Sequence, residues 1–494
     1  MSDKPENSRG RSLAESAKSA LLWGGGATLA RDLLQFLTML ILVRLLTPED
    51  YGRFAMAQSI IGLIAMFSFG TFVSHSLQER SPDDIDWNRH FSFGLILNIV
   101  LFIVTLVVAW GLSVTKKYHQ ASWPLVGLSL VLIVEIVSGL RHRMLESQHE
   151  WKRYRLITLY GAVLGAVAGV SVAFLGGGYW ALVVQFPLLG VPAVIDLLWK
   201  ERWKPRWSLS LTEYQETLRF GMSRMGAGLA VRGRQTVEQG MLASTYDFSG
   251  LGIFIRTIGL AMLLAGRFGS IVMLMLYPVV TRIEAGTKRF RDAASKIFGM
   301  VCLVTVPAAF FLAANANQVV HVIYGETWMK VANMLPLGVI GVVLSGLAGV
   351  LSQLLLANNQ VRYCFLIDIA ISIFGVALVF WLVPKGMHFY FLGLVVQGLL
   401  SLMVSLVILG KTGGIEIFKV WDSLLAPVVG SSVALSVISF VPYLKEMDVA
   451  ALGSASLIFS LIYVVSLRVM FPGYIKGIVA YAPNSQHIMS WLAL

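Results

Sequence analysis

Charged residues are scarce in this amino-acid sequence. Only 13% of its 494 residues are charged, 56% are hydrophobic, and the mean hydropathy is +0.74. A globular protein carries about 25% charged residues, whereas a helix that crosses a bilayer needs about 20 largely apolar residues in a row. The shortage of charge therefore excludes a soluble globular fold and predicts an all-α membrane protein.

Residues and motifs for covalent, metal or nucleotide chemistry are also few. The two cysteines, Cys302 and Cys364, lie far apart in apolar stretches, which excludes a disulfide framework and a zinc site. The eight histidines show no metal-ligand spacing, and no phosphate-binding loop motif occurs. We therefore expect no cofactor, no metal site and no direct use of ATP. The net charge of +12 is explained by the cytoplasmic loops of a membrane protein rather than by binding to nucleic acid.

Long apolar windows, in contrast, recur along the whole chain. The first is too long for the core of a signal peptide, so we expect it to be retained as a helix. Fourteen windows are predicted as transmembrane helices, and charges interrupt the seventh. They cover residues 19–46, 52–78, 91–114, 122–145, 155–175, 179–199, 214–244, 250–281, 297–318, 331–357, 362–383, 389–410, 420–441 and 449–470.

The distribution of lysine and arginine predicts the orientation of these helices. With a cytoplasmic N-terminus, 25 basic loop residues fall on the cytoplasmic side and 6 on the outer side. Cytoplasmic loops are the ones enriched in Lys and Arg, so we expect a multi-pass protein of the bacterial inner membrane with both termini in the cytoplasm. The basic segments 141–155 and 200–206 are explained by the same rule, and they could also attract an anionic lipid headgroup.

The two halves of the sequence resemble one another at a separation of about 200 residues. The ordered matches pair Gly52 and Phe54 with Gly252 and Phe254, Phe69 with Phe268, Arg89-His90-Phe91 with Lys288-Arg289-Phe290, Arg153-Tyr154 with Arg362-Tyr363, and Val183-Val184-Gln185 with Val395-Val396-Gln397. Their preserved order favours an internal duplication. Six helices in each repeat would place the pseudo-symmetry axis along the membrane normal, as in transporters with two rocking bundles.

The repeat divides the chain into segments. We predict a cytoplasmic tail at 1–18, a first lobe at 19–200, a basic cytoplasmic linker at 201–213, a second lobe at 214–410, two further helices at 411–470 and a C-terminal tail at 471–494.

Of the 39 lysines and arginines, 31 are assigned to loops or helix ends, and the eight that remain are all arginines inside the predicted helices: Arg31, Arg44, Arg219, Arg224, Arg232, Arg234, Arg256 and Arg267. A charge at the bilayer centre costs about 2.5–3.5 kcal/mol on insertion scales, so such residues usually face a bundle interior or an aqueous cavity. A guanidinium group binds phosphate oxygens in pairs and stays protonated when partly desolvated. The group of arginines therefore predicts an anionic ligand, with pyrophosphate as the natural candidate.

Not every arginine in this group has the same interpretation. Arg44 and Arg219 lie near helix ends, where their side chains can reach the interface. Arg256 and Arg267 are eleven residues apart, a spacing that returns them to one face of an α-helix. The candidate substrate-binding residues of a central cationic cavity are Arg31, Arg224, Arg232, Arg256 and Arg267, with structural ion pairing as the alternative.

Several carboxylates also lie in the apolar windows, Glu135 among them. Burial raises the pKa of a carboxyl group, so any of them could carry a coupled proton, and each could equally be the ion-pair partner of an arginine. Arg31 has Asp32 beside it, and Arg234 can pair with Glu238 four residues on. The candidate coupling or ion-pair carboxylates are Asp32, Asp196, Glu238 and Asp368, and their spacing selects none of them.

Three short motifs resemble a known family. They are Val43-Arg44-Leu45-Leu46-Thr47-Pro48-Glu49-Asp50-Tyr51-Gly52, then Leu276-Tyr277-Pro278-Val279-Val280-Thr281-Arg282, and Tyr324-Gly325-Glu326 followed by Trp328. Together with the helix pattern they resemble the polysaccharide transporter family of the multidrug/oligosaccharidyl-lipid/polysaccharide exporter superfamily, which includes the Wzx-type flippases. The resemblance implies a V-shaped pair of lobes that alternate access, a cationic cavity, and a polyprenyl-diphosphate-linked oligosaccharide as substrate. It also implies glycosyltransferases and a polysaccharide polymerase of the same pathway as partners.

Three other functions stay open at this stage. A lipid II flippase handles a polyprenyl diphosphate too. A drug or ion antiporter is disfavoured because arginines in the cavity would repel a cationic drug. A polytopic polysaccharide polymerase or ligase is disfavoured because such enzymes need sizeable outer loops, and the outward loops here are short. The leading interpretation is a flippase driven by the proton gradient or the membrane potential.

Overall fold

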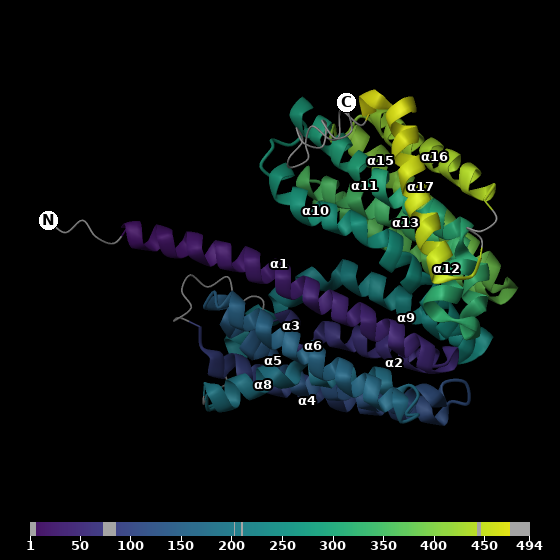
Figure 1. Cartoon of the computed structure of the whole chain (residues 1–494). Helices are drawn as coiled ribbons and strands as arrows, with labels where there is room; N and C mark the ends of the chain where they lie inside the picture. Colours follow the sequence, from purple (N-terminus) through teal and green to yellow (C-terminus); the bar gives the residue numbers. More distant parts are fainter. Residues whose placement is uncertain (1–5, 73–84, 202, 209–210, 442–445, 475–494) are drawn as a thin grey trace. The chain divides into compact units, whose positions relative to one another are not determined.

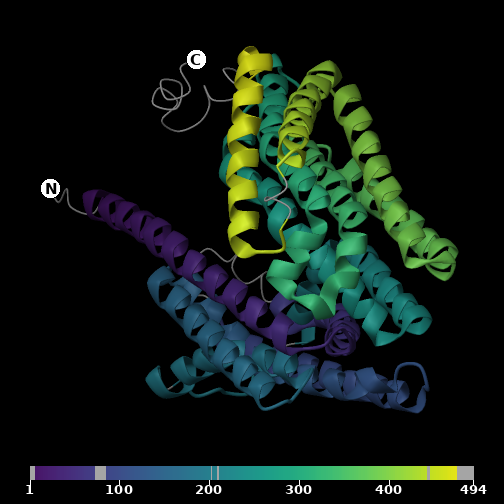
Figure 2. The same ribbon diagram turned by 45° about the vertical axis from the view of Figure 1, so that its right-hand side comes forward.

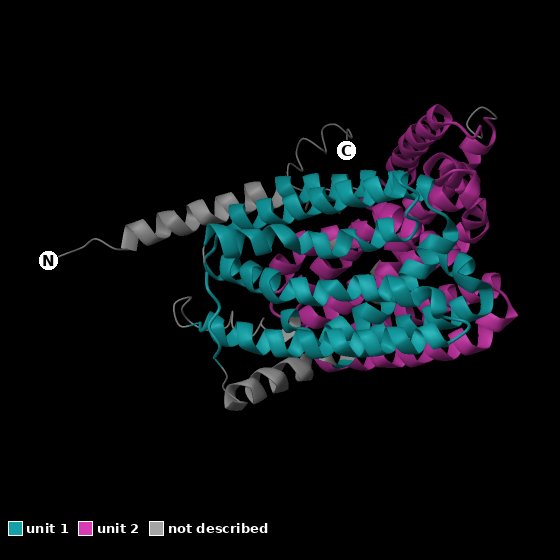
Figure 3. Ribbon diagram, turned by 90° about the horizontal axis from the view of Figure 1, so that it is seen from below, with its two compact units in different colours: residues 1–252 teal, residues 253–494 magenta. Residues whose placement is uncertain are grey.

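The computed structural model describes residues 6–72, 85–201, 203–208, 211–441 and 446–474, and every element in these ranges is helical (Figure 1). The chain divides into two compact units, Met1–Gly252 and Ile253–Leu494, which are coloured separately in Figure 3. The first unit therefore extends beyond the predicted lobe 19–200 and includes the whole of the seventh window, 214–244.

Unit 1 contains nine α-helices and three short turns among its described residues. In chain order they are α1 Glu6–Leu45, α2 Pro48–Ile64, η1 Ala65–Phe67, α3 Phe69–Phe72, α4 Trp87–Val114, η4 His119–Ala121, α5 Ser122–Ser147, α6 Trp151–Phe174, α7 Trp180–Val183, α8 Gln185–Ile195, η5 Asp196–Lys200 and the greater part of α9 Leu211–Ala261. Helix α1 packs along α6, and α5 packs against α4 and α8 (Figure 1).

Unit 2 begins with the end of α9. Its further elements are η6 Met262–Gly266, α10 Arg267–Val280, α11 Lys288–Ala314, α12 Ala316–Tyr324, η7 Glu326–Trp328, α13 Met329–Ala357, α14 Val361–Leu382, η8 Val383–Lys385, α15 Met387–Lys411, α16 Ile417–Ser439 and α17 Val449–Met470. Helices α16 and α17 pack against α11 around an apolar cluster that includes Phe459 and Tyr463, and Figure 2 shows α17 beside α16.

Twelve helical stretches among the described residues are long and apolar enough to cross a membrane, against fourteen predicted windows. One difference lies in a stretch of 53 residues from Gly228 to Val280, which joins the later part of the seventh window to the eighth window. A straight helix of that length would measure about 80 Å, far more than the roughly 30 Å of a hydrocarbon core. The chain is in fact kinked at Tyr246 and Asp247, where Asp247 adopts φ 57°.

The other difference lies in the second window. Helix α2 has only 17 residues and ends at Ile64, where the turn η1 and then Ser68 interrupt it before α3 begins. The remainder of that window lies outside the described residues. The fold class is therefore confirmed as all-helical with many membrane-spanning segments, while the count of fourteen stays a prediction.

The motif after the first helix builds the start of α2. Thr47 is the N-cap: its hydroxyl accepts from the Asp50 amide, and the Asp50 carboxylate accepts from the Thr47 amide at 3.1 Å. This reciprocal pair is a capping box, and Pro48 follows at the first helical position, where proline is favoured. The second oxygen of Asp50 accepts from the Tyr179 amide at 3.1 Å and so ties α2 to the start of α7.

Gly52, the last residue of this motif, allows a close contact between backbones. A methyl group added at Gly52 would lie 1.7 Å from the carbonyl oxygen of Phe248, and one added at Gly252 would lie 1.8 Å from the carbonyl oxygen of Pro48. Any side chain at either position would therefore force the two segments apart. Gly52 and Gly252 are matched residues of the predicted repeat, and they make reciprocal contacts.

Two turns between helices, one in each unit, adopt the same backbone geometry. The turn between α5 and α6 has His149 at φ 57°, and the turn between α13 and α14 has Asn359 at φ 60°. In both, the amide two residues past the helix bonds a carbonyl of the last turn at about the same distance, 3.2 Å for His149 and 3.1 Å for Asn359. A left-handed residue just past a helix is a common way to satisfy its last carbonyls. The two turns therefore end their helices in the same way, and the internal duplication stays a prediction.

Candidate functional site

Arg31, the candidate arginine on α1, has a local partner. The Arg31 guanidinium lies 3.3 Å from a carboxylate oxygen of Asp32, and each side chain is 36% exposed. The expected pairing of these neighbours is therefore present. Because both groups remain more than a third exposed, the pair leaves part of the guanidinium available to a ligand.

The arginines on α9 differ from one another. Arg234 pairs with Glu238 four residues on at 3.3 Å, and both side chains are largely buried, as expected for a structural pair. Arg232 is exposed, and no ion pair to it is recorded among the described residues. The hydroxyl of Thr236 donates to the Ser59 carbonyl at 3.2 Å, which fixes this part of α9 against α2. The side chains of Arg219 and Arg224 lie outside the described residues.

The two candidate arginines of unit 2 are separated by a change in helix type. Arg256 is half-buried on α9 and Arg267 is exposed at the start of α10, with the π-helical turn η6 between them. A π turn accommodates one extra residue, so positions beyond it rotate by about 100° relative to a continuous α-helix. The prediction that an eleven-residue spacing places both side chains on one helical face assumed an uninterrupted α-helix, and the π turn removes that assumption.

Tertiary contacts hold the backbone near Arg256 in place. The Tyr324 hydroxyl donates to the Arg256 carbonyl at 3.4 Å, and Tyr324 itself is buried at the end of α12. Tyr324 opens the third motif, so this motif anchors the segment that carries Arg256.

Asp196 is the centre of an ion-pair network at one end of unit 1. One of its oxygens accepts from Arg141 at 2.6 Å and the other from Arg153 at 3.0 Å. Glu201 bonds both of these arginines as well, at 3.0 Å from Arg141. This end of unit 1, where α5 ends, α6 begins and α8 runs into the basic linker, is called the α5–α6–α8 corner below.

The network changes the interpretation of the basic segment 141–155. Arg141 was counted among the loop charges, but its side chain is only 2% exposed on α5. With two carboxylates around it, Arg141 stabilises the corner and is not accessible to a lipid headgroup. Of the candidate carboxylates, Asp196 therefore has a clear structural role.

Glu135 lies in an apolar window of the sequence but was not among the selected candidate carboxylates. Its carboxylate accepts from the Ser68 hydroxyl at 3.0 Å, and the Gly70 amide and the Asn98 side chain also bond it. Asn98, fully buried on α4, accepts from the Phe69 amide at 2.9 Å. These bonds satisfy backbone and hydroxyl groups freed where α2 is interrupted, which a bilayer would otherwise leave unpaired at high cost.

The last candidate carboxylate, Asp368, is half-buried on α14, and no ion pair to it is recorded in the described part of the chain. In the same ranges no three His, Cys, Asp or Glu side chains gather so as to hold a metal ion. The candidate arginines thus lie on both units, with Arg31, Arg224 and Arg232 in unit 1 and Arg256 and Arg267 in unit 2. Their grouping around one cavity stays a prediction.

Comparison with known families decides the relationship of this chain. The family model described as polysaccharide biosynthesis protein matches residues 41–333, which is more than half of the chain. The chain belongs to the polysaccharide biosynthesis protein family. The matched region contains the capping-box motif of α2, the ion-pair network and the candidate arginines on α9 and α10.

Individual members of the family show the same relationship. The chain is 24% identical to the succinoglycan biosynthesis transport protein ExoT of Rhizobium meliloti (strain 1021) over 307 residues, and the match spans 60% of each chain. It is 21% identical to the lipopolysaccharide biosynthesis protein WzxC of Escherichia coli (strain K12) over 362 residues, or 72% of each chain.

Solved structures show that other transporters have the same fold. The lipid II flippase MurJ in an inward closed conformation matches with a TM-score of 0.75 at 13% identity, over 92% of this chain and 100% of that one. An inward-facing multidrug resistance transporter of the MATE family matches with a TM-score of 0.55 at 14% identity, over 77% and 95%. At these identities the likeness shows a common fold, one that solved transporters and flippases use.

Proposed function

We propose that this protein is a flippase that moves polyprenyl-diphosphate-linked oligosaccharide repeat units across the bacterial inner membrane by alternating access. The cargo is the precursor of an O-antigen or an exopolysaccharide. Family membership and the name of the succinoglycan transport protein support this function, and they argue against a polymerase or ligase.

The observation that carries the proposal is the exposure of arginines inside apolar helices. Arg232 and Arg267 lie in the hydrophobic stretch Gly228–Val280, and both are exposed. Facing lipid would cost each of them about 2.5–3.5 kcal/mol on insertion scales, which favours an aqueous cavity over lipid as their surroundings. A diphosphate offers such groups pairs of oxygens, which guanidinium groups bind in a bidentate way.

The orientation follows from the basic loops. With 25 basic residues on one side and 6 on the other, both termini are cytoplasmic. The diphosphate therefore enters the cavity from the cytoplasmic leaflet, where glycosyltransferases assemble the repeat unit. A polysaccharide polymerase of the same pathway would use the glycan after it reaches the outer leaflet.

Reconstitution of the purified full-length protein in liposomes tests the function. The assay follows a fluorescent lipid-linked glycan from the inner to the outer leaflet, where an impermeant quencher reaches it. We expect translocation of the repeat unit without a change in glycan mass. Lengthening of the glycan would instead identify a polymerase, preferred movement of lipid II would identify a lipid II flippase, and export of a cationic dye alone would identify an antiporter.

Substitution of the two unit 2 arginines tests the binding site. Arg256→Ala and Arg267→Ala should each slow translocation at least tenfold while the protein remains folded, because an anion contact is lost. Lys at either position should restore only part of the rate, since it binds phosphate as a point charge. Arg44→Ala is the matched control, because Arg44 lies in the last turn of α1. Full activity of the double alanine variant would exclude both residues from the site.

A further inference from the structure

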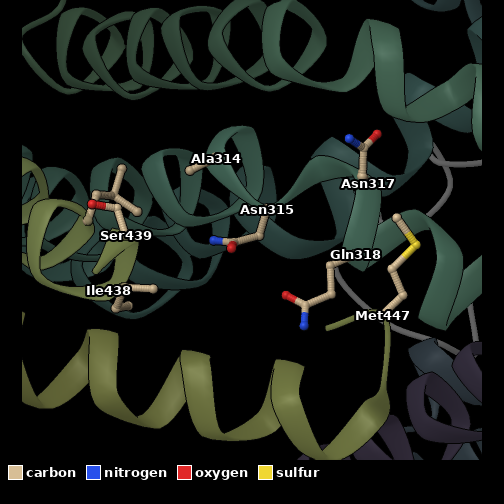
Figure 4. Close-up of a pocket in the computed structure, with 8 residues that line it drawn as sticks. Ala314, Asn315, Asn317, Gln318, Ile438, Ser439 and Met447 are labelled. Carbon is tan, nitrogen blue, oxygen red and sulfur yellow. The ribbon is translucent and has the colours of Figure 1, made fainter. Parts of the chain in front are cut away.

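Unit 2 contains a cavity whose described lining includes neither Arg256 nor Arg267 of the same unit. It lies where α11 meets α12 and where α16 ends, and its volume is about 360 Å³. Figure 4 shows the side chains of Asn315 and Gln318 directed into this space, with Ser439 and Ile438 of α16 and with Met447 around it. Sites for small ligands have volumes of about 300–1,000 Å³, so this cavity is large enough for a single sugar ring.

The described lining of the cavity combines uncharged polar groups with apolar side chains. Amide and hydroxyl groups come from Asn315, Asn317, Gln318 and Ser439. The remaining lining residues are aliphatic or thioether side chains: Ala314, Leu435, Ile438 and Met447. Since no arginine, lysine, aspartate or glutamate side chain is found among its described lining residues, the described part of this cavity does not suit a diphosphate or a cation.

Gln318 lacks one hydrogen bond. The side chain is 5% exposed, and its amide nitrogen donates to the Glu446 carbonyl. A carbonyl can only accept, so this bond fixes which end of the Gln318 amide is nitrogen. The other end, Oε1, is buried and has no hydrogen-bond partner within the part of the chain that the structure describes. A buried acceptor without a donor is unusual in a native protein, and a ligand hydroxyl in the cavity would supply that donor.

Neighbouring side chains could bond further hydroxyl groups. The Asn315 amide nitrogen donates to the Phe311 carbonyl at 2.9 Å, and the Ser439 hydroxyl donates to the Ser436 carbonyl at 2.7 Å. Both side chains keep an oxygen that can accept. Leu435 and Ile438 provide an apolar surface against which the carbon face of a sugar ring can pack. An acyl chain would fit poorly, because it would leave the amide oxygens of Gln318 and Asn315 without a hydrogen-bond donor.

The position of the cavity in the helices determines the side of the membrane that it faces. Helix α11 begins at Lys288, in a basic loop assigned to the cytoplasm, and reaches the cavity one span later at Ala314. Helix α16 likewise reaches the cavity at its C-terminal end, Ser439. With both termini cytoplasmic, the cavity lies at the outer face.

We propose that this cavity binds a neutral sugar ring of the cargo at the outer face of the membrane, after the diphosphate has been carried across. The inference rests on the proposed function and orientation for its cargo, and on Gln318, Asn315 and Ser439 for its chemistry. It assigns the glycan a binding site separate from that of the diphosphate.

Saturation-transfer NMR on the full-length protein in detergent tests the proposal. The probes are methyl β-glucopyranoside and methyl β-galactopyranoside, with glycerol as a hydroxyl-rich probe that lacks a ring. We expect saturation of at least one glycoside and a loss of at least fivefold in Gln318→Met, which keeps the shape of the side chain. Asn315→Ala should weaken the signal in the same way. Ser436→Ala is the matched control, because Ser436 is exposed one turn before Ser439 and does not line the cavity.

The outcomes separate this proposal from the proposed function. Unchanged glycoside signals in both Gln318→Met and Asn315→Ala, absent signals in the wild type, or equal saturation by glycerol would each overturn the sugar site. Translocation in liposomes is measured on the same samples. Normal translocation without glycoside binding would agree with the proposed flippase and overturn the sugar site. Glycoside binding without translocation would agree with a sugar site and contradict the proposed flippase.

Accessibility provides an independent check of the side. Ser439→Cys, in a background with Cys302 and Cys364 replaced by serine, should react with an impermeant maleimide added to intact spheroplasts. Both native cysteines are buried and should react slowly, and replacing them ensures that any labelling comes from position 439. Labelling only after the membrane is opened would place the cavity in the cytoplasm and overturn the proposal.

Discussion

Replacing Gly52 by alanine is the perturbation whose effect the structure determines most directly. The added methyl carbon would lie 1.7 Å from the Phe248 carbonyl oxygen, whereas real contacts of this kind are not shorter than 3.0 Å, so the backbones must separate by about 1.3 Å. Overpacking costs about 1–3 kcal/mol, and a shift of two backbones belongs at the upper end. Alanine gains about 1 kcal/mol over glycine in a helix, which leaves a net loss of about 2 kcal/mol.

Gly62→Ala is the matched control in the same helix. A methyl group there meets nothing within 4 Å, so only the gain of about 1 kcal/mol in helix propensity applies. The two variants should therefore differ by about 3 kcal/mol. In a chain of this length 1 kcal/mol shifts the Tm by about 1 °C, because the entropy of unfolding scales with the number of residues.

The assay is thermal unfolding in detergent, followed by tryptophan fluorescence. We expect the Tm of Gly52→Ala to fall by about 2 °C, that of Gly62→Ala to rise by about 1 °C, and Gly252→Ala to behave like Gly52→Ala. Equal Tm values for Gly52→Ala and Gly62→Ala would refute the close backbone contact. A fall in Gly52→Ala alone would refute its reciprocity.

Three further substitutions test the polar contacts within the units. Arg141→Ala should lower the free energy of unfolding by about 3–5 kcal/mol, because it leaves buried Asp196 with less compensation; a loss below 1 kcal/mol in denaturant titration would mean that the network contributes little. Glu135→Gln should keep the folded yield, since the amide retains an acceptor, whereas Glu135→Leu should cost about 1–3 kcal/mol for each donor left unpaired; equal yields of both would contradict this role. Asn358→Ala should cost a similar amount per lost bond, because Asn358 joins the Gly286 amide at 3.0 Å to Thr412, and hydrogen exchange at the Gly286 amide should rise.

The sequence predicted most of the fold because bilayer crossing depends on a local property. Twenty apolar residues form a helix in lipid wherever they occur, so the windows at α4, α5 and α6 coincide with observed helices. The interruptions were less visible. Neither the end of α2 at Ile64 nor the π turn η6 contains a proline or a charge that would mark it in the sequence. The break after α2 is instead stabilised by tertiary contacts, such as the hydrogen bond that the Ser68 hydroxyl donates to Glu135.

The candidate site was predictable in composition but not in geometry. Residue spacing identified the Arg234–Glu238 pair, because side chains at i and i+4 lie on the same face of a helix. Arg31 and Asp32 are adjacent in the chain, where helix geometry does not bring side chains together, so only the structure shows their contact at 3.3 Å. Arg141 and Asp196 are 55 positions apart, and only the packing of α5 against α8 brings them together. A buried carboxylate and a basic residue in two different windows were a signal, but the sequence offered too many pairings to choose among.

Different kinds of contact hold the α5–α6–α8 corner of unit 1 and the turn between α13 and α14 in unit 2. Ion pairs around Asp196 hold the α5–α6–α8 corner, whereas in unit 2 the amide of Asn358 joins the turn after α13 to the end of α15. The cost of desolvating charges falls as temperature rises, while an amide hydrogen bond has no such compensation. Heating should therefore loosen the contacts of Asn358 first, so that unit 1 and unit 2 lose their order at different temperatures.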